Sequence, residues 1–517
     1  MKHLKALVVI LAAGIILGAG ISYLFPDGNF WISWLGTTAL LSLSLFILFF
    51  AWQKFGQGKQ LAWLMISAFF LRLVLGTGLT LALPSFGWDE PAQNAGYLFY
   101  DAFQRDNQAW QLAESGDSIL NQTREELYTD QYGGMLTISA VLYRVLSPDV
   151  HRSYLVLLLG AFAFTLGIPF FYRAAAIRWD TRLAGMASWF LVLYPDGLLY
   201  TSSQMREPFI LGLSMIAFWA VLRLPSRKPQ GWIALGLSMA LMTVISSRIA
   251  AVVFFFLLML FLLENLPGLP AKVRRFTWVI LLVLVLLFLA ASWAWLQSSA
   301  EWDMILTERG SGWVAKVIEE IGAQYRIPFL VIYGIAQPVL PAAIAEPTLP
   351  LWKVINIARA AGWYMLVPLL VYAAFALFKV KDKKERQVWA WMAAFSILWI
   401  IIASARAGGD QWDNPRYRAN MLPWLVLTAS WAVRQAIVSR DVWLPRLLLV
   451  EAVFLGFFTN WYFSRYFLLW RRMLFWEMVS WITGLSALIL LGGLGYDRWK
   501  KQRLKAKENA DSAGNMR

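Results

Sequence analysis

The sequence predicts an all-α polytopic membrane protein with large outer loops that carry juxtamembrane helices. Hydrophobic residues make up 59% of its 517 residues. Soluble domains contain roughly 45–50% apolar residues, so the composition alone indicates a membrane protein. Aromatic residues reach 16%, which suits a protein with many helices, because amphipathic rings collect where the membrane meets water.

Apolar runs long enough to cross a bilayer recur along the whole chain. A transmembrane helix needs about 20 apolar residues, and this criterion predicts about fourteen helices. The expected spans are residues 6–25, 30–52, 61–83, 153–172, 183–200, 207–223, 231–247, 249–264, 276–297, 361–379, 387–404, 420–438, 444–463 and 474–494. The first could pass for a signal peptide, but its length and the lack of a small-residue cleavage site favour a retained helix.

The positive charge is arranged as in a membrane protein. The formal net charge is +15, which in a soluble protein would suggest a nucleic-acid partner. Here Lys and Arg lie in short clusters between apolar runs, which indicates cytoplasmic loops beside anionic lipid. The polar stretches 84–152, 201–206, 298–360 and 405–419 then fall outside. We expect an integral protein of a bacterial cytoplasmic membrane, with both termini cytoplasmic, an extracytoplasmic site and no nucleic-acid partner.

The expected organisation is one integral domain with two elaborated outer loops. Its parts are two extra N-terminal helices at 1–60, a catalytic transmembrane core at 61–300 that includes the outer loop 84–152, a second outer loop at 301–360, C-terminal helices at 361–497 and a basic cytoplasmic tail at 498–517. The tail is basic and then polar, so we expect it to be disordered.

Two apolar segments do not count as spans. Gly133 to Ser147 has only about 15 residues and contains Arg144, so we interpret it as a helix lying on the outer membrane surface. Counting it as a span would move every later loop to the opposite face. Ile327 to Ile344 is broken by prolines and is interpreted as re-entrant or juxtamembrane. An amphipathic helix is expected in the second outer loop from the spacing of Val314, Val317, Ile318 and Ile321.

Residue usage narrows the possible chemistry. The chain has no cysteine, which excludes disulfides, thiol catalysis and cysteine-ligated metals. Its two histidines are His3 and His151, so a histidine-based metal site or catalytic triad is nearly excluded. Carboxylates and arginines are therefore the candidates for catalysis.

The first candidate pair is Asp89 and Glu90, where the third apolar run ends and the first long polar segment begins. A carboxylate at a membrane boundary can take a proton from a hydroxyl or an amine, or hold a metal ion. The alternative is structural, because both acids can cap a helix that starts at Pro91. We favour Asp89 as the base and treat Glu90 as supporting.

The second candidate is Glu207, which follows Arg206 and precedes Pro208 at the outer mouth of a span. Charged groups at membrane depth are costly, which favours a functional role. The alternatives are that Glu207 lies in a first helical turn, where an acid is favoured by the helix dipole, or that it pairs with Arg206.

The third candidate is the polar run from Arg406 to Arg418. Outer-face arginines run against the positive-inside trend, and guanidinium groups bind phosphate through paired hydrogen bonds. The residues expected to bind a donor phosphate are Arg206, Arg406, Arg416, Tyr417 and Arg418. The alternative is an ion-paired loop in which Asp410 and Asp413 balance Arg416 and Arg418.

Isolated arginines add to these sets, and with Asp410 they are expected to support the site. Arg72 lies in the middle of the third apolar run, and Arg248 lies in a tight outer hairpin between two spans. An unpaired arginine in lipid costs at least a few kcal/mol, so we expect Arg72 to have a buried partner. Snorkelling of its side chain is the alternative.

An outer face with two acids and several arginines predicts glycosyl transfer from a lipid-linked donor. Arginines would hold the phosphate of a sugar carried on a polyprenyl phosphate in the bilayer. A carboxylate would activate a lipid, glycan or protein acceptor, and one in-line displacement would invert the anomeric carbon.

The order of these motifs resembles the GT-C superfamily of polyprenyl-phosphate-sugar glycosyltransferases, which includes protein O-mannosyltransferases and aminoarabinose transferases. In that family an Asp-Glu pair in the first large outer loop is catalytic, which matches Asp89-Glu90. A second acid before proline lies in the next outer loop, which matches Glu207-Pro208 with Glu in place of Asp. The resemblance covers residues 61–225 and, in part, 400–430, and two extra helices precede it. Some members use a divalent metal and others do not, so the resemblance requires no cofactor and leaves a divalent metal ion as an alternative.

Two other classes are alternatives. An O-antigen ligase or polymerase uses a diphosphate-linked glycan and outer arginines, and would not need the pair Asp89 and Glu207. A lipid or polysaccharide transporter (a flippase) would be expected to have inverted repeats and polar sites at the membrane midplane. The sequence has no such repeat, and its polar residues gather on one face.

Overall fold

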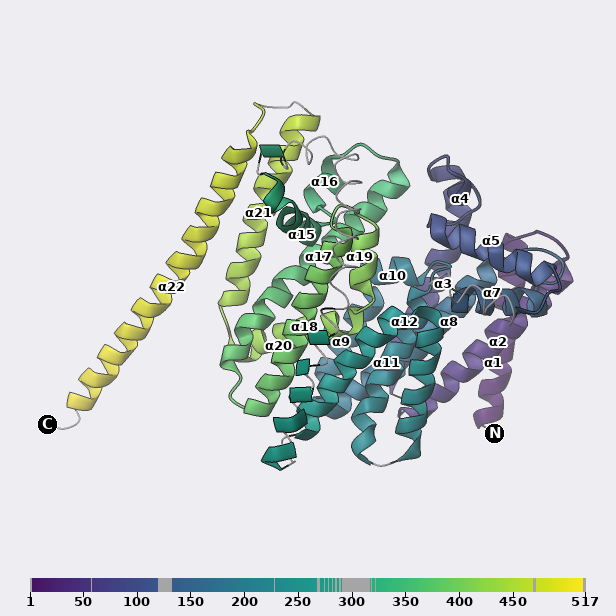
Figure 1. Ribbon diagram of the computed structural model, residues 1–517, viewed down its shortest axis with the longest axis horizontal. Coiled ribbons are helices and arrows are strands. Elements are labelled where there is room, and N and C mark those ends of the chain that lie inside the picture. Colours follow the sequence, from purple (N-terminus) through teal and green to yellow (C-terminus); the bar gives the residue numbers. More distant parts are fainter. Residues whose placement is uncertain are drawn as a thin grey trace. The chain divides into compact units, whose positions relative to one another are not determined.

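The computed structural model describes residues 2–56, 58–119, 133–226, 228–266, 322–467 and 471–514, with scattered residues in 270–290 and 317–320. Within these residues every regular element is a helix (Figure 1). Ten described helices are long and apolar enough to span a membrane, or up to 11 if the bent pair Asp413–Ala419 and Leu422–Ser439 is one span. The all-α polytopic class is confirmed, whereas the count of about fourteen is not.

The chain forms two compact units, and the candidate site lies in the first. The first unit comprises Met1–Gln337 and Val380–Ser430, and the second comprises Pro338–Lys379 and Trp431–Arg517. The segment 361–497, which was expected to be one part from the order of its spans, is divided between the two units. Residues Val380–Ser430 belong to the first unit and the rest to the second.

The helices of the first unit are α1 (Lys2–Leu24), α2 (Phe30–Lys54), α3 (Lys59–Phe86), α4 (Pro91–Asn94), α5 (Tyr100–Glu114), α7 (Gly133–Leu146), α8 (Tyr154–Arg178), α9 (Thr181–Leu193), α10 (Pro195–Thr201), α11 (Glu207–Arg223), η1 (Leu224–Ser226), α12 (Pro229–Asn265), η3 (Ala323–Tyr325), α15 (Arg326–Ala336), α18 (Lys383–Ala407) and α19 (Asp413–Ala419). The second unit holds α16 (Leu340–Ala345), α17 (Pro350–Ala376), η4 (Leu377–Lys379), α21 (Trp443–Tyr466) and α22 (Phe475–Gly514). α20 (Leu422–Ser439) begins in the first unit and ends in the second.

Helix α8 packs against α2, α3, α9 and α11. Its contacts with α11 show in which direction the two helices run relative to each other. α8 and α11 run parallel, because Gly160 of α8 lies against Pro208 and Gly167 lies against Gly212. The close approach needs glycine, since a Cβ on Gly212 would lie 2.2 Å from the carbonyl oxygen of Ala163. The starts of α8 and α11 therefore share one end of the bundle.

Helix α12 bends sharply at Ser246, whose φ of −163° and ψ of 92° are extended rather than helical. Gly231, near its start, packs at the C-terminal end of α11, and Glu264, near its finish, pairs with the C-terminal end of α8. Between them, Val244 lies against α7. α12 therefore crosses and returns, as the predicted spans 231–247 and 249–264 require, with Arg248 just after the bend.

Basic clusters gather at the end of the bundle where α8 and α12 finish. Arg178 of α8 pairs with Glu264 of α12 and, at 2.6 Å, with Glu385 of α18. Lys384 of α18 also pairs with Glu264, at 2.9 Å. Glu207 begins α11 at the opposite end. We call this opposite end the outer end, following the charge rule that favours cytoplasmic basic loops.

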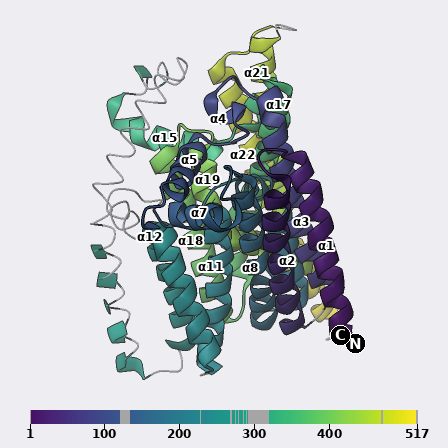
Figure 2. The ribbon, with the colours of Figure 1, turned by 90° about the vertical axis from the view of Figure 1, so that its right-hand side faces the viewer.

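Helices α5 and α7 lie across the outer ends of the long helices (Figure 2). Arg144 of α7 donates to the carbonyl oxygens of Leu112 at 2.7 Å, Asp117 at 3.0 Å and Ala113 at 3.3 Å, at the C-terminal end of α5. α7 is thus held against α5, and it is shorter than a span, as expected for Gly133 to Ser147. Most of the amphipathic helix predicted at 314–321 and much of the predicted span 276–297 fall outside the described residues.

Two expected elements differ in the structure. The predicted span 183–200 is divided into α9 and α10 at Tyr194, whose φ of −62° and ψ of 121° are extended. Pro195 is the cause, because proline disfavours a helical conformation in the preceding residue. The tail predicted to be disordered from about residue 500 instead continues α22 to Gly514. Its sequence is rich in Lys and Ala, which have high helix propensity.

Candidate functional site

Three segments that are distant in sequence meet at the outer end of the first unit. Glu207, the first residue of α11, has a fully buried side chain. Arg416 of α19 places Nε 3.2 Å from Oε1 of Glu207 and Nη1 2.9 Å from Oδ2 of Asp101. Arg206 lies 3.9 Å from Glu207, and Asp413 lies 3.2 Å from Arg416. We call these five residues the ionic cluster.

The ionic cluster sets the charge of its own acids. Burial alone would raise the pKa of Asp101, but Arg416, and more weakly Arg105, holds that pKa below its ordinary value. Burial raises the pKa of Asp413 above its ordinary value, and Arg416 only partly opposes this, because Asp410 and Asp101 add to it. Asp101 is therefore a carboxylate at neutral pH, and Asp413 takes up a proton at higher pH than Asp101 does.

Local sequence explains how α11 and α19 present these side chains. α11 begins with Glu207 and Pro208, and proline suits the first turn because its missing N–H has no helical partner there. Before α19, Oδ1 of Asp410 accepts from the backbone N–H groups of Trp412 at 2.6 Å and Asp413 at 2.8 Å. This Asx-type turn starts the helix that carries Arg416. Asp410, which the sequence predicts as a supporting residue, forms the start of this helix.

The other predicted phosphate ligands surround this turn. Arg418 is buried and donates to the backbone carbonyl oxygen of Gln337. The Arg406 guanidinium lies 4.2 Å from the ring centre of Tyr417, and the Tyr417 hydroxyl is 3.4 Å from Asp413. Arg418 therefore anchors the loop, whereas Arg406 and Tyr417 flank the ionic cluster.

Asp89 and Glu90 lie on the exposed surface of the first outer loop. Oδ1 of Asp89 accepts a hydrogen bond of 2.9 Å from Asn94. Glu90 occupies the N-cap position of α4, but its side chain makes no capping hydrogen bond. The acid of this loop that contacts Arg416 is instead Asp101, which the sequence interpretation missed. The sequence pattern that could have identified Asp101 is its pairing with Arg105. These two residues lie four positions apart and so share one face of a helix.

Apolar packing holds Asp101 against the second outer segment. Ala92, Tyr97 and Ala102 form a buried cluster with Met205, which immediately precedes Arg206. Arg105 also donates to the backbone carbonyl oxygen of Gln204. The first outer loop and the start of α11 are thus joined beside the ionic cluster.

The two isolated arginines have different environments. Arg72 is fully buried, with its guanidinium 3.6 Å from the ring centre of Phe164 and Nη1 3.0 Å from the carbonyl oxygen of Ala68. Its expected buried partner is therefore an aromatic face and a carbonyl, while Nε and Nη2 have no hydrogen-bond partner among the described residues. Arg248 is exposed beside the bend of α12.

A second polar cluster surrounds Asp106, which is 2% exposed. Its carboxylate accepts from the hydroxyls of Tyr97 at 2.6 Å and Tyr143 at 2.7 Å, and Nε2 of His151 lies 3.1 Å away. Burial, reinforced by Asp106, raises the pKa of both tyrosines, so both phenols stay protonated and donate. The sequence interpretation set His151 aside because the chain has only two histidines.

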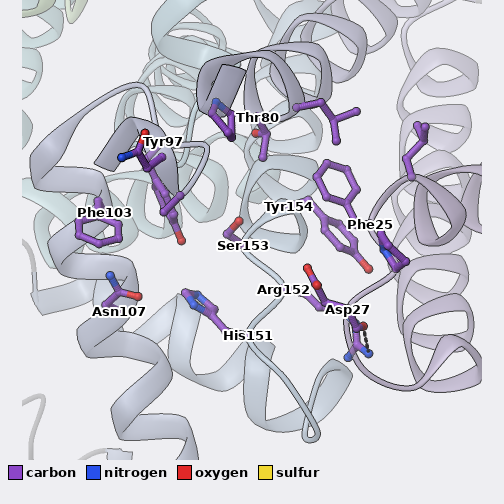
Figure 3. A pocket seen from close by; sticks show the side chains of 16 residues that line it. Phe25, Asp27, Thr80, Tyr97, Phe103, Asn107, His151, Arg152, Ser153 and Tyr154 are labelled. Carbon is purple, nitrogen blue, oxygen red and sulfur yellow. Dashed lines mark hydrogen bonds between the residues drawn. The ribbon is translucent and has the colours of Figure 1, made fainter. Parts of the chain in front are cut away.

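A cavity of about 390 Å³ adjoins this second cluster (Figure 3). Its walls come from the α1–α2 turn, the end of α3, the segment from Asn94 to Asn107 and the residues before α8. Asn94, the hydrogen-bond partner of Asp89, lies on its wall. We call this space the outer cavity.

The fold and the site together define a helical membrane protein with an ionic cluster at one end of its transmembrane bundle, in which Glu207, Arg206 and Arg416 are buried and Asp101 and Asp413 are partly exposed. No group of three or more Asp, Glu, His or Cys side chains within the described residues is placed to hold a metal ion. No family model matches the chain, and no curated protein matches its sequence.

Proposed function

We propose that this protein is a membrane glycosyltransferase that moves a sugar from a polyprenyl-phosphate donor to an acceptor on the extracytoplasmic face of a bacterial cytoplasmic membrane. The observation that carries the proposal is the ionic cluster, in which Arg416 lies between Glu207 and Asp101 with Arg206 beside it. Phosphate recognition favours guanidinium groups, and activation of an acceptor hydroxyl needs a base such as a carboxylate. The cluster supplies both, at the end of the bundle opposite the basic loops.

The chemistry assigns a role to four of the five members of the cluster. The acceptor hydroxyl attacks the anomeric carbon, the bond from that carbon to the phosphate oxygen breaks, and its electron pair leaves with the phosphate. Arg416 and Arg206 stabilise the charge that develops on the leaving phosphate. Glu207 has no exposed surface, so it orients Arg416 rather than meeting the substrate.

A carboxylate of the first outer loop takes the acceptor proton in this reaction. Asp101 is 45% exposed and contacts Arg416, so its oxygens are accessible and lie beside the phosphate ligand. We therefore propose Asp101 as the base. Asp89, favoured from the sequence, is the alternative base on the same loop, and Glu90 is its neighbour in support.

The test is turnover by the purified protein in proteoliposomes. A panel of polyprenyl-phosphate hexoses is supplied, and released polyprenyl phosphate is measured by mass spectrometry. Asp101→Asn should abolish release while donor binding is kept, and Arg416→Ala should slow release by about 100-fold or more. The control is Arg182→Ala, which changes an exposed arginine in the first turn of α9, away from the ionic cluster.

The outcomes separate the alternatives. Loss of release in Asp89→Asn with normal release in Asp101→Asn would make Asp89 the base, as the GT-C resemblance implies. Release of polyprenyl diphosphate from a diphosphate-linked glycan would favour a ligase or polymerase. Movement of lipid between leaflets without any release would favour a transporter. A folded protein that turns over no donor in the panel would reject the proposal.

A further inference from the structure

We propose that the outer cavity binds an uncharged, hydroxyl-rich sugar ring, and that this ring belongs to the acceptor. The role as acceptor rests on the proposed function, whereas the binding of a sugar does not. The cavity has a volume of about 390 Å³, which falls within the range of roughly 300–1,000 Å³ that is usual for small-ligand sites.

Polar groups of both hydrogen-bonding kinds face this space. The side chains of Asn107 and Asp27 line it, and neither makes a side-chain hydrogen bond within the described part of the chain. An amide both donates and accepts, while a carboxylate only accepts. Sugar hydroxyls also donate and accept, so they can satisfy both side chains at once.

The cavity does not offer a free cation to an anionic ligand. Arg152 lies on its wall, but Nη2 donates to Asp149 at 2.8 Å and to the carbonyl oxygens of Asp27 and Asn29, each at 3.1 Å. Nη1 donates to Asp149 at 2.5 Å and to Ser147 at 2.8 Å. A phosphate or carboxylate ligand would therefore meet a guanidinium that is already paired, together with the negative charge of Asp27.

Aromatic rings supply the apolar walls that a sugar ring needs. Figure 3 shows Tyr97 and Phe103 on one side of the space and Phe25 and Tyr154 on the other. Small-ligand sites combine such aromatic walls with a few polar groups that fix orientation. The C–H faces of a pyranose fit against rings, while its hydroxyl edge reaches the polar groups.

His151 lines the outer cavity, and Asp106 and Trp110 fix the position of its imidazole ring. Nε2 lies 3.1 Å from Oδ2 of the buried Asp106, and the ring stacks on Trp110 with centres 5.5 Å apart. An imidazole that donates through Nε2 leaves Nδ1 as an acceptor. Asp106, which also takes the Tyr97 and Tyr143 hydroxyls, thus fixes both the tautomer and the orientation of His151.

Helix α5 connects the outer cavity with the ionic cluster. Asn107 of α5 lines the cavity, and Asp101 of the same helix contacts Arg416. Tyr97, which also lines the cavity, packs in the apolar cluster with Met205, next to Arg206. A sugar in the cavity and a phosphate at the ionic cluster would therefore occupy neighbouring parts of one outer surface.

The experiment measures binding of methyl α-D-mannopyranoside, methyl β-D-glucopyranoside and methyl β-D-galactopyranoside to the full chain in nanodiscs, by saturation-transfer difference NMR. We expect at least one glycoside to bind. Asn107→Ala and His151→Gln should each weaken binding about fivefold or more, as loss of one hydrogen bond implies. Gln108→Ala, the matched control at the next, exposed position of α5, should bind as the wild type does.

Each outcome decides the proposal separately from the glycosyltransferase activity. Absence of binding for all three glycosides would overturn it, even if donor turnover is measured. Preferred binding of glucuronate or glucose 6-phosphate would also overturn it, because the ligand would then be anionic. Binding that depends on Asn107 and His151 in a protein without donor turnover would keep the sugar site and reject the proposed function.

Discussion

Arg416 places its Nε 3.2 Å from Oε1 of Glu207, whose side chain is completely buried. This pair joins the start of α11 to α19, two segments that are far apart in the sequence. Loss of one partner of a buried ion pair leaves an uncompensated charge and typically costs about 3–5 kcal/mol. The contact therefore links the stability of the outer end to the chemistry proposed for it.

A double-mutant cycle tests this coupling. We expect Glu207→Gln and Arg416→Gln each to lower the free energy of unfolding by about 3 kcal/mol or more, because each leaves the other charge buried. The double variant should lose less than the sum by about 1–3 kcal/mol. The measurement is equilibrium unfolding in mixed micelles, and strictly additive effects would contradict the coupling.

Stability of the outer end should fall at acid pH through Asp101. Its folded-state pKa lies below the ordinary value of 3.8, so its contribution is present above about pH 4 and is lost as the pH falls through the folded-state pKa. Because Asp101 is 45% exposed, solvent limits this contribution to about 1 kcal/mol. Melting temperatures of wild type and Asp101→Asn should differ at pH 7 and converge toward pH 3. A constant difference over this range would argue against the shift.

Removal of the Arg72 charge should not destabilise the fold. Its guanidinium faces the Phe164 ring and one carbonyl oxygen, while Nε and Nη2 have no hydrogen-bond partner among the described residues. Replacing a poorly compensated buried charge by an apolar side chain of similar length is often neutral or stabilising. We expect Arg72→Met to unfold at the same or a higher denaturant concentration than wild type. A loss above about 1 kcal/mol would indicate stronger compensation than these contacts provide.

Arg144 should hold the last turn of α5. Three of its nitrogens donate to the carbonyl oxygens of Leu112, Ala113 and Asp117, in that turn and just beyond it, at distances from 2.7 to 3.3 Å. Arg144→Met removes these donors, so hydrogen exchange at residues 111–117 should become faster, at a cost of about 1–3 kcal/mol. Arg144→Lys should be intermediate, since an ammonium cannot reach all three carbonyls together. Unchanged exchange in Arg144→Met would mean that α7 packing alone holds this turn.

Single cysteines can test the assignment of the two ends, because the natural chain has none. We expect Ser118→Cys, at the exposed end of the α5 segment, to react with a membrane-impermeant maleimide added to intact cells. Lys381→Cys, in a basic loop, should react only after the membrane is opened. The opposite pattern would place Asp101 and Arg416 on the cytoplasmic side and remove the basis of the proposed function.

The sequence by itself determined the helical membrane class, and its charge pattern predicts the sidedness of its loops. Hydrophobic length depends on composition over about 20 residues, and the charge rule depends on local Lys and Arg, so both can be counted along the chain. Counting also set Gly133 to Ser147 apart from the spans, from its length and from Arg144, and the helix there is shorter than a span. It failed at residues 183–200, where one proline divides an apolar run that looks continuous by hydropathy.

Only the tertiary structure decided which charged residues meet. Asp89 and Asp101 lie in the same polar loop, and local pattern favoured Asp89 because it follows a span directly. Packing of the first outer loop against Met205 instead brings Asp101 to Arg416 and leaves Asp89 on the surface with Asn94. Likewise, His151 has no neighbouring motif, and Asp106 reaches it only through the fold. Side-chain convergence depends on long-range packing, whereas hydrophobic length and charge are properties of short segments.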